Sequence, residues 1–195
     1  PKPQNPLYRN KFYFILIFNF ISKLKLFMLS FASLTNLSHP GGFQCLHKGH
    51  FLKSVNHNTV KLAQATTPFK QNLGYDALVH LSLLEDMDQE IKIGLASKLD
   101  LENNDEDIFE FYLSSLNGSV HSATGESKKY LPKVQKGALI TIHINTKKGS
   151  IGFSVNGLFK GVAFKSEKIE YNELFLTVEM SDIGQMIMVT DDADY

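Results

Sequence analysis

The stretch Gly137–Phe164 constrains the fold more than any other part of the chain, because its apolar residues alternate with polar ones. Isoleucine occupies every second position from Ile140 to Ile144, and a polar residue stands at each position between. This two-residue period is typical of an antiparallel strand with one buried face. The period resumes at Ile151 after a polar turn, and Asn156-Gly157 then favours a two-residue hairpin turn. The stretch therefore predicts a three-stranded meander.

Two glycines, Gly152 and Gly161, fall inside the predicted strands of this meander. A glycine in a strand usually marks a bulge or a place where another side chain crosses close to the backbone. We therefore expect an irregular or crowded backbone at both positions.

Short strand-like segments separated by turn residues run through the rest of the chain, and no segment after residue 77 keeps a helical period over ten residues. Such a series predicts an antiparallel β-sandwich. The strand-like segments are 59–66, 77–84, 90–96, 108–113, 173–180 and 185–190.

The end of the meander carries a family resemblance. Phe153-Ser154-Val155-Asn156-Gly157, followed by Lys160-Gly161-Val162-Ala163-Phe164, resembles the C-terminal signature of the SPRY (B30.2-like) domain family. Ile93–Ala96 is similar to the central strand of that family, and the resemblance covers about residues 43–190. It implies an all-β fold, an antiparallel β-sandwich of the SPRY or concanavalin-like jelly-roll type.

Three parts are expected along the chain: an apolar and basic N-terminal segment at 1–40, the SPRY-like sandwich at 41–190, and an acidic tail at 191–195. Within the first part, Phe12–Ile21 is intensely apolar but short for a membrane span, and two lysines follow it. Three interpretations stay open for it: a fragment or mistranslated upstream region with Met28 as the true start, a membrane anchor or secretory signal, or a helix packed on the sandwich.

The charges are balanced overall but distributed unevenly. The chain has 20 basic and 20 acidic residues, yet no Asp or Glu precedes Asp76. The lysines before Asp76 are scattered and form no basic stripe with interleaved aromatic residues, so we expect no nucleic-acid partner. The single cysteine, Cys45, forms no internal disulfide, which favours an intracellular, cytoplasmic protein.

No standard catalytic motif is present, neither a nucleophile elbow, a phosphate-binding loop, a dinucleotide fingerprint nor a zinc-protease helix. We therefore expect no catalytic residues, no cofactor and no enzymatic activity. Cys45, His47, His50 and His57 are residues of zinc-binding type, but their spacing fits no standard zinc module. The acidic stretch 100–107 lacks the glycine and the glutamate of a calcium loop. No metal site is expected.

The family resemblance implies a non-catalytic protein–protein interaction module, in which loops at one edge of the sandwich recognise a short segment of a protein or peptide partner. It also implies an adaptor role in a larger complex such as a ubiquitin ligase. The loops expected to bind are 66–75, 96–107 and 114–130, because loops on a rigid scaffold commonly carry recognition. The candidate binding residues are Phe69, Gln71, Asn72, Tyr75, Tyr112, Ser122, Lys129 and Tyr130.

A second function stays open, that of a lectin-like sandwich that binds carbohydrate, since jelly-roll sheets also bind sugars on a concave face. The absence of tryptophan counts against it. Membrane contact is expected only if residues 12–31 form a real anchor.

Overall fold

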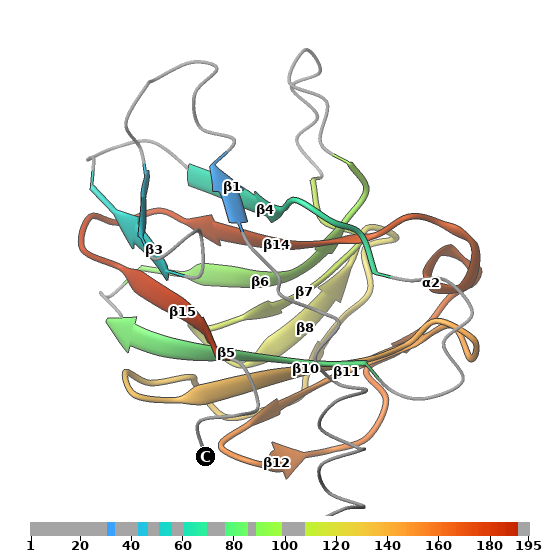
Figure 1. Cartoon of the computed structure of the whole chain (residues 1–195). Coiled ribbons are helices and arrows are strands. Elements are labelled where there is room, and N and C mark those ends of the chain that lie inside the picture. Colours follow the sequence, from blue (N-terminus) through green and yellow to red (C-terminus); the bar gives the residue numbers. More distant parts are fainter. Residues whose placement is uncertain are drawn as a thin grey trace, which may run out of the picture.

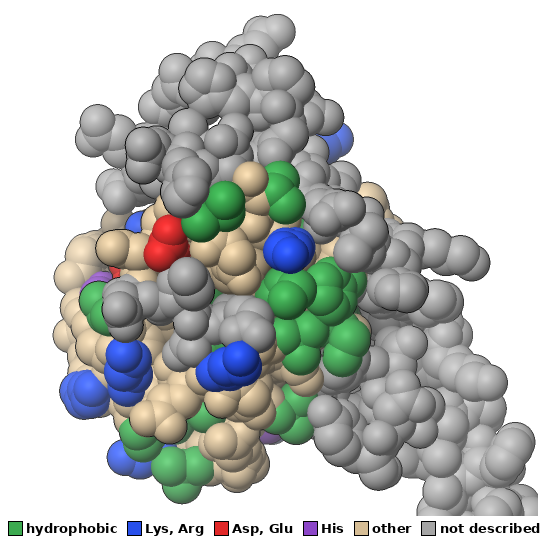
Figure 2. All heavy atoms as spheres, turned by 90° about the vertical axis from the view of Figure 1, so that its left-hand side faces the viewer, with side chains coloured by type: hydrophobic (Ala, Val, Ile, Leu, Met, Phe, Trp, Pro, Cys, Tyr) green, Lys and Arg blue, Asp and Glu red, His purple; other side chains and the backbone are tan. Residues whose placement is uncertain are grey.

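The computed structural model describes residues 31–33, 43–46, 51–55, 61–69, 77–85, 89–98 and 108–190, which are coloured in Figures 1 and 2. Within these ranges the chain forms two antiparallel sheets that pack face to face, so the predicted β-sandwich is confirmed. Among the same residues no helix has the length and apolar character that crossing a membrane requires.

The first sheet, called sheet A here, occupies the upper layer of Figure 1. Its strand order is β1 (Phe31–Ser33), β4 (Lys61–Ala65), β14 (Phe175–Met180), β6 (Ile91–Ala96), β7 (Phe111–Ser114), β8 (Ser119–Ser122) and β9 (Ser127–Lys129). Strand β1 lies within the segment 1–40 that the sequence separates from the domain, and it pairs with β4 through Phe31 and Ala65.

The second sheet, called sheet B, includes the meander, which lies in the lower part of Figure 1. Its strand order is β12 (Leu158–Phe159), β11 (Ser150–Val155), β10 (Leu139–Asn145), β5 (Ala77–Glu85), β15 (Met186–Thr190), β3 (Phe51–Ser54) and β2 (Phe43–Leu46), and β13 (Phe164–Lys165) also pairs with β11. A short helix, α2 (Glu167–Tyr171), follows β13, and Ser166 caps it by accepting a hydrogen bond from the Lys168 backbone amide.

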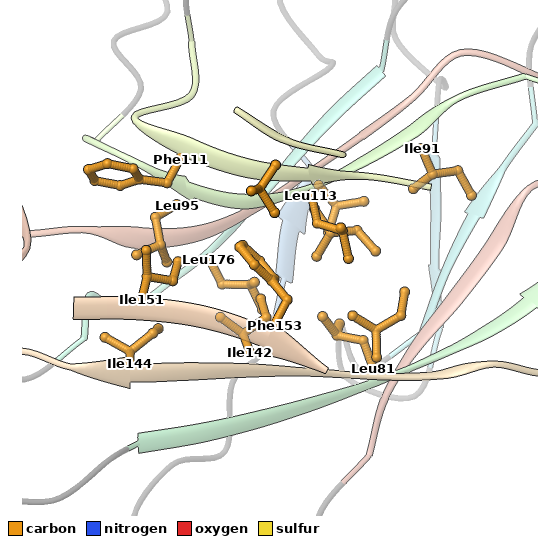
Figure 3. Packing of buried hydrophobic residues seen from close by; sticks show 14 of the residues in the cluster. Leu81, Ile91, Leu95, Phe111, Leu113, Ile142, Ile144, Ile151, Phe153 and Leu176 are labelled. Atoms are coloured by element: carbon orange, nitrogen blue, oxygen red, sulfur yellow. The ribbon is translucent and has the colours of Figure 1, made fainter. Parts of the chain in front are cut away.

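The core lies between the two sheets, where alternate residues of each strand meet. Figure 3 shows Phe153 of β11 and Ile142 of β10 pointing toward Leu113 of β7 and Leu176 of β14. All four side chains belong to one buried cluster, and Phe153 is completely inaccessible to solvent. Full burial of such a side chain contributes roughly 1.5–3 kcal/mol each, so this interlayer contact is a main source of stability.

The hairpin predicted at Asn156-Gly157 is confirmed, since both residues have positive φ angles, 51° and 77°. The predicted returning strand 158–164 differs from expectation. It is broken into β12 and β13, and residues 160–163 between them leave the register of β11. Gly161 has a φ of +94°, a backbone conformation that favours glycine, which explains the break.

The crowding expected at Gly152 is also confirmed. A Cβ atom at this position would lie 2.7 Å from the Gly161 carbonyl oxygen and 2.7 Å from the Phe159 ring. The ring of Phe159 therefore lies directly on the backbone of β11, where any side chain would displace it.

The tightest backbone approach in sheet A is at Gly94, in the middle of β6. A Cβ atom there would meet the Phe111 carbonyl oxygen of the neighbouring strand at 1.9 Å. We expect Gly94→Ala to lower the free energy of unfolding by about 3 kcal/mol or more, because backbone must shift to admit the methyl group. Gly184→Ala is the control, since Gly184 has a φ of +87° but no neighbour within 4 Å. Its cost should be about 1–2 kcal/mol, from the left-handed backbone alone. Urea unfolding measures both, and equal losses would contradict the close approach.

Candidate functional site

The outer face of sheet A, on the side away from the core, carries a row formed by Gly94, Tyr112 and His121. Tyr112 stands between Phe111 and Leu113 of β7, both of which belong to the buried cluster, so its side chain lies on the opposite face. Directly across from Tyr112 are Gly94 of β6 and His121 of β8. This alternation places an aromatic pair where two neighbouring strands meet.

A hollow of about 220 Å³ opens beside this pair, at the end of sheet A where β7 begins and β8 ends. Its aromatic part is a stack of the Tyr112 and His121 rings, whose centroids are 4.6 Å apart at an interplanar angle of 6°. Phe109 packs against Tyr112 in a tilted arrangement, with ring centroids 5.3 Å apart at an interplanar angle of 54°. We call this the aromatic hollow, and its lining residues are Lys92, Ile108, Phe109, Tyr112, His121, Ser122, Ala123, Gly125, Glu126 and Glu179.

An ion pair forms the polar wall of the aromatic hollow. The Lys92 ammonium lies 2.8 Å from a Glu179 carboxylate oxygen and 5.5 Å from the centre of the Tyr112 ring. Burial by itself would lower the pKa of Lys92, but the hydrogen bond and charge of Glu179, with smaller effects of Tyr112 and Glu90, raise it above its usual value. Lys92 therefore stays charged at neutral pH and fixes the position of the Tyr112 ring.

A second hollow, of about 180 Å³, lies on the other side of the turn between β8 and β9. We call it the helix hollow, because Ser166 and Lys168 at the start of α2 line it. The Lys168 ammonium lies 2.6 Å from the Glu110 carboxylate, which ties α2 to the segment that enters β7. Ser122, Ala123 and Glu126 line both hollows, so the β8–β9 turn forms a ridge between them.

The structure brings two of the sequence-predicted binding residues together at this place. Tyr112 lines the aromatic hollow, and Ser122 lines both hollows while its hydroxyl lies 2.8 Å from that of Thr124. The segment 114–130, expected as one binding loop, instead contains strands β8 and β9. Of this segment, only the end of β8 and the turn after it, residues 121–126, reach the hollows.

The other described candidates lie elsewhere. Phe69 is buried in the core with 3% of its surface exposed. Lys129 lies at the far end of β9, where its ammonium donates to the Asn117 carbonyl oxygen in the turn between β7 and β8. Gln71, Asn72 and Tyr75 lie outside the described residues, as does most of the predicted loop 96–107.

Tyr130 is a structural residue that joins the edges of the two sheets. Its ring belongs to the buried cluster, and its hydroxyl donates to the Gly161 carbonyl oxygen and accepts a 3.4 Å hydrogen bond from the Phe153 amide. Both backbone groups lie where β12 and β13 leave β11 without a strand partner. The Tyr130 hydroxyl therefore supplies the hydrogen bonds that a continuous strand would have made.

Several lining residues were missed in the sequence, namely Lys92, Phe109, His121, Glu126 and Glu179. The alternation in Ser119–Ser122, with Val120 buried and His121 outward, was the available signal for β8. The pairing of Lys92 with Glu179 had no sequence signal, because the two residues are neighbours only through the register of β6 and β14.

Among the described residues, no group of three or more His, Cys, Asp and Glu side chains is arranged to hold a metal ion. His47, His50 and His57 of the weighed zinc cluster lie outside the described residues.

The fold and its signature define a class of protein. The family model of the SPRY domain matches residues 79–191, more than half of the chain, and the chain belongs to this family. SPRY domains bind protein partners and are generally non-catalytic interaction modules.

Solved structures agree on the fold. The SPRY domain of human HERC1 is 16% identical, with a TM-score of 0.63 over 80% of this chain and 99% of that chain. The PSpry domain of TRIM65 is 14% identical, with a TM-score of 0.62 over 98% of both chains. The neuralized NHR1 domain of Drosophila melanogaster is 14% identical, with a TM-score of 0.52 over 84% of this chain and 98% of that one. No curated protein sequence gives a significant match.

We expect Tyr130→Phe to lower the free energy of unfolding by about 1–3 kcal/mol, because the Phe153 amide and the Gly161 carbonyl lose their partner. Tyr171→Phe is the matched control, since Tyr171 is 71% exposed and its loss should change stability by less than about 0.5 kcal/mol. Urea unfolding of the full chain measures both. Equal stability of the two variants would contradict the role given to the Tyr130 hydroxyl.

The pH dependence of stability provides a separate test. Burial raises the pKa of Tyr130, against a smaller opposing effect of the hydrogen bond from Phe153. The folded state therefore holds this proton more tightly than the unfolded state, so the associated stability is complete below a pH of about 10 and falls as the pH rises further. The Tyr130→Phe variant lacks this group, and its stability should fall less steeply above that pH. Parallel slopes for variant and wild type would contradict the assignment.

Proposed function

We propose that this SPRY domain recognises a short segment of a partner protein at the two hollows on either side of the β8–β9 turn, and that it serves as an adaptor in a larger assembly. The observation that supports this most is the shared ridge, Ser122 to Glu126, which lines both hollows. A segment lying across the ridge places one side chain in each hollow.

The size of the hollows favours a peptide over a small molecule. Pockets for cofactors and metabolites usually occupy roughly 300–1,000 Å³. At about 220 and 180 Å³, each hollow is smaller than that range. Both are therefore suited to single side chains of a segment that continues over the surface.

The chemistry of the hollows indicates which side chains fit. The aromatic hollow is lined by the rings of Tyr112 and Phe109 beside the carboxylates of Glu126 and Glu179. An aromatic or aliphatic side chain stacks on such a surface, and an arginine stacks and also meets the carboxylates. The rings are already held by the Lys92–Glu179 pair, which reduces the entropy lost on binding.

The test is selection of binding peptides from a random library displayed on phage, with the full chain as bait. Dissociation constants of the selected peptides are then measured by fluorescence anisotropy. We expect Tyr112→Ala to weaken binding about tenfold or more, because truncation of an aromatic anchor removes a large share of binding energy. His121→Ala should weaken it as well, and its thermal melt shows whether either variant is still folded.

Lys129→Ala is the matched control, because Lys129 is exposed on the same pair of edge strands but at the opposite end. It should leave the dissociation constants unchanged. Peptides that bind both Tyr112→Ala and the wild type equally would place recognition elsewhere. If the protein selects no peptide from the library but binds sugars on a glycan array, the lectin-like function is favoured instead.

A further inference from the structure

An exposed apolar patch lies at the free edge of sheet B, away from the two hollows. Leu158, Phe159 and Val162 are 47%, 45% and 48% exposed. They belong to β12 and to the segment after it, at the bottom of Figure 1. The Phe159 ring is fixed in place, since its centroid lies 4.3 Å from that of His143 and its edge lies on the Gly152 backbone. The patch is therefore a preformed feature of the fold.

In the sequence, this patch lies within a segment that contains basic residues but no acidic ones. From Ser127 to Ser166 it contains eight lysines and no Asp or Glu, and all eight lysine side chains are exposed. These lysines are Lys128, Lys129, Lys133, Lys136, Lys147, Lys148, Lys160 and Lys165. The balance of charge over the whole chain hides this local excess.

Two of the lysines border the patch. Lys160 lies between Phe159 and Val162 in the sequence. Lys128 reaches over from β9, where its ammonium donates to the Ala163 carbonyl oxygen and lies 4.9 Å from the centre of the Phe164 ring. We call these two lysines together with Leu158, Phe159 and Val162 the β12 surface. Lys165 on β13 is not part of it, because it pairs with Ser150 and lines the helix hollow.

The lower part of Figure 2 corresponds to the β12 end of Figure 1, and there blue lysine side chains lie beside green apolar ones. No red carboxylate is visible among the described residues in that part of the view. Exposed apolar side chains next to lysines are typical of surfaces that bind anionic lipid.

We propose that the β12 surface docks on a membrane containing anionic lipid. Leu158, Phe159 and Val162 enter the boundary between headgroups and acyl chains, and the lysines contact lipid phosphates and carboxylates. Contact with the membrane through β12 is separate from peptide recognition, because no residue of the β12 surface lines either hollow.

A membrane fits the β12 surface better than a peptide does. Addition of a peptide strand requires a row of unpaired backbone groups, and β12 has only two residues. Insertion of a peptide side chain requires a hollow, and neither hollow described above is lined by Leu158, Phe159 or Val162. A lipid bilayer requires only projecting apolar side chains and positive charge.

The experiment is flotation of the full chain with vesicles of phosphatidylcholine alone or with 30% phosphatidylserine added, at low and at physiological salt. We expect binding that requires phosphatidylserine and weakens with salt. Lys160→Gln should reduce the partition coefficient about fivefold. Val162→Ser should reduce it as well without disturbing the Phe159 contacts.

The controls remove the same chemistry from other parts of the surface. Lys98→Gln removes an exposed lysine that precedes β7, and Tyr171→Ser removes a 71% exposed ring on α2. Both variants should bind vesicles like the wild type. Because every variant contains residues 1–40, any contribution of that segment is the same in all of them and cancels in the comparison. Circular dichroism establishes that each variant is folded.

Three results would overturn the proposal. The first is equal partition of the Lys160→Gln variant and the wild type. The second is binding that does not depend on phosphatidylserine. The third is absence of vesicle binding together with saturable binding of a peptide of alternating Glu and Leu that is lost in the Lys160→Gln variant, which would assign the β12 surface to an acidic protein segment. None of these results affects the phage selection, so the two proposals fail independently.

Discussion

The contact between the β9 edge of sheet A and the β11 edge of sheet B depends on the hydrogen bonds of the Tyr130 hydroxyl. The chain that returns from the hairpin leaves β11 at Gly152 and Phe153. The Phe153 amide and the Gly161 carbonyl therefore have no strand to pair with. The Tyr130 side chain comes from the end of β9, at the edge of the other sheet, and meets both groups. One phenol thereby joins the last strand of sheet A to the last strands of sheet B. It also allows the segment 160–163 to bulge outward, and that bulge exposes Val162 beside the side chains of β12.

The period of the strands produces both the core and the candidate site. Phe111 and Leu113 pack between the sheets, and the residue between them must point outward. In β8 the same rule turns Val120 inward and His121 outward, so the register of the two strands sets the Tyr112 and His121 rings side by side. The candidate site is therefore positioned by the core on the other face of the same strands, and the Lys92–Glu179 pair then holds the Tyr112 ring.

The sequence was sufficient for the fold and partly sufficient for the site. Alternation and the Asn156-Gly157 turn identify the sandwich, because period and turn chemistry are local properties that a short segment displays. Tyr112 and Ser122 were found as candidates and lie at the hollows, whereas Tyr130 had the same appearance in the sequence and is a core residue. The difference depends on where the ring points across the two layers. The Lys92–Glu179 pair depends on the register of strands more than eighty residues apart, which no local pattern encodes.

The strand order has a consequence for how the chain is made. The last long strands in the sequence, β14 and β15, occupy interior positions: β14 lies between β4 and β6, and β15 lies between β5 and β3. Neither sheet is continuous before these strands are added, so the early strands wait with exposed edges while the ribosome completes the chain. Pairings between such distant segments form slowly, and unpaired edges favour aggregation. A nascent chain of this protein therefore acquires its complete two-layered structure only after residue 190 has left the exit tunnel.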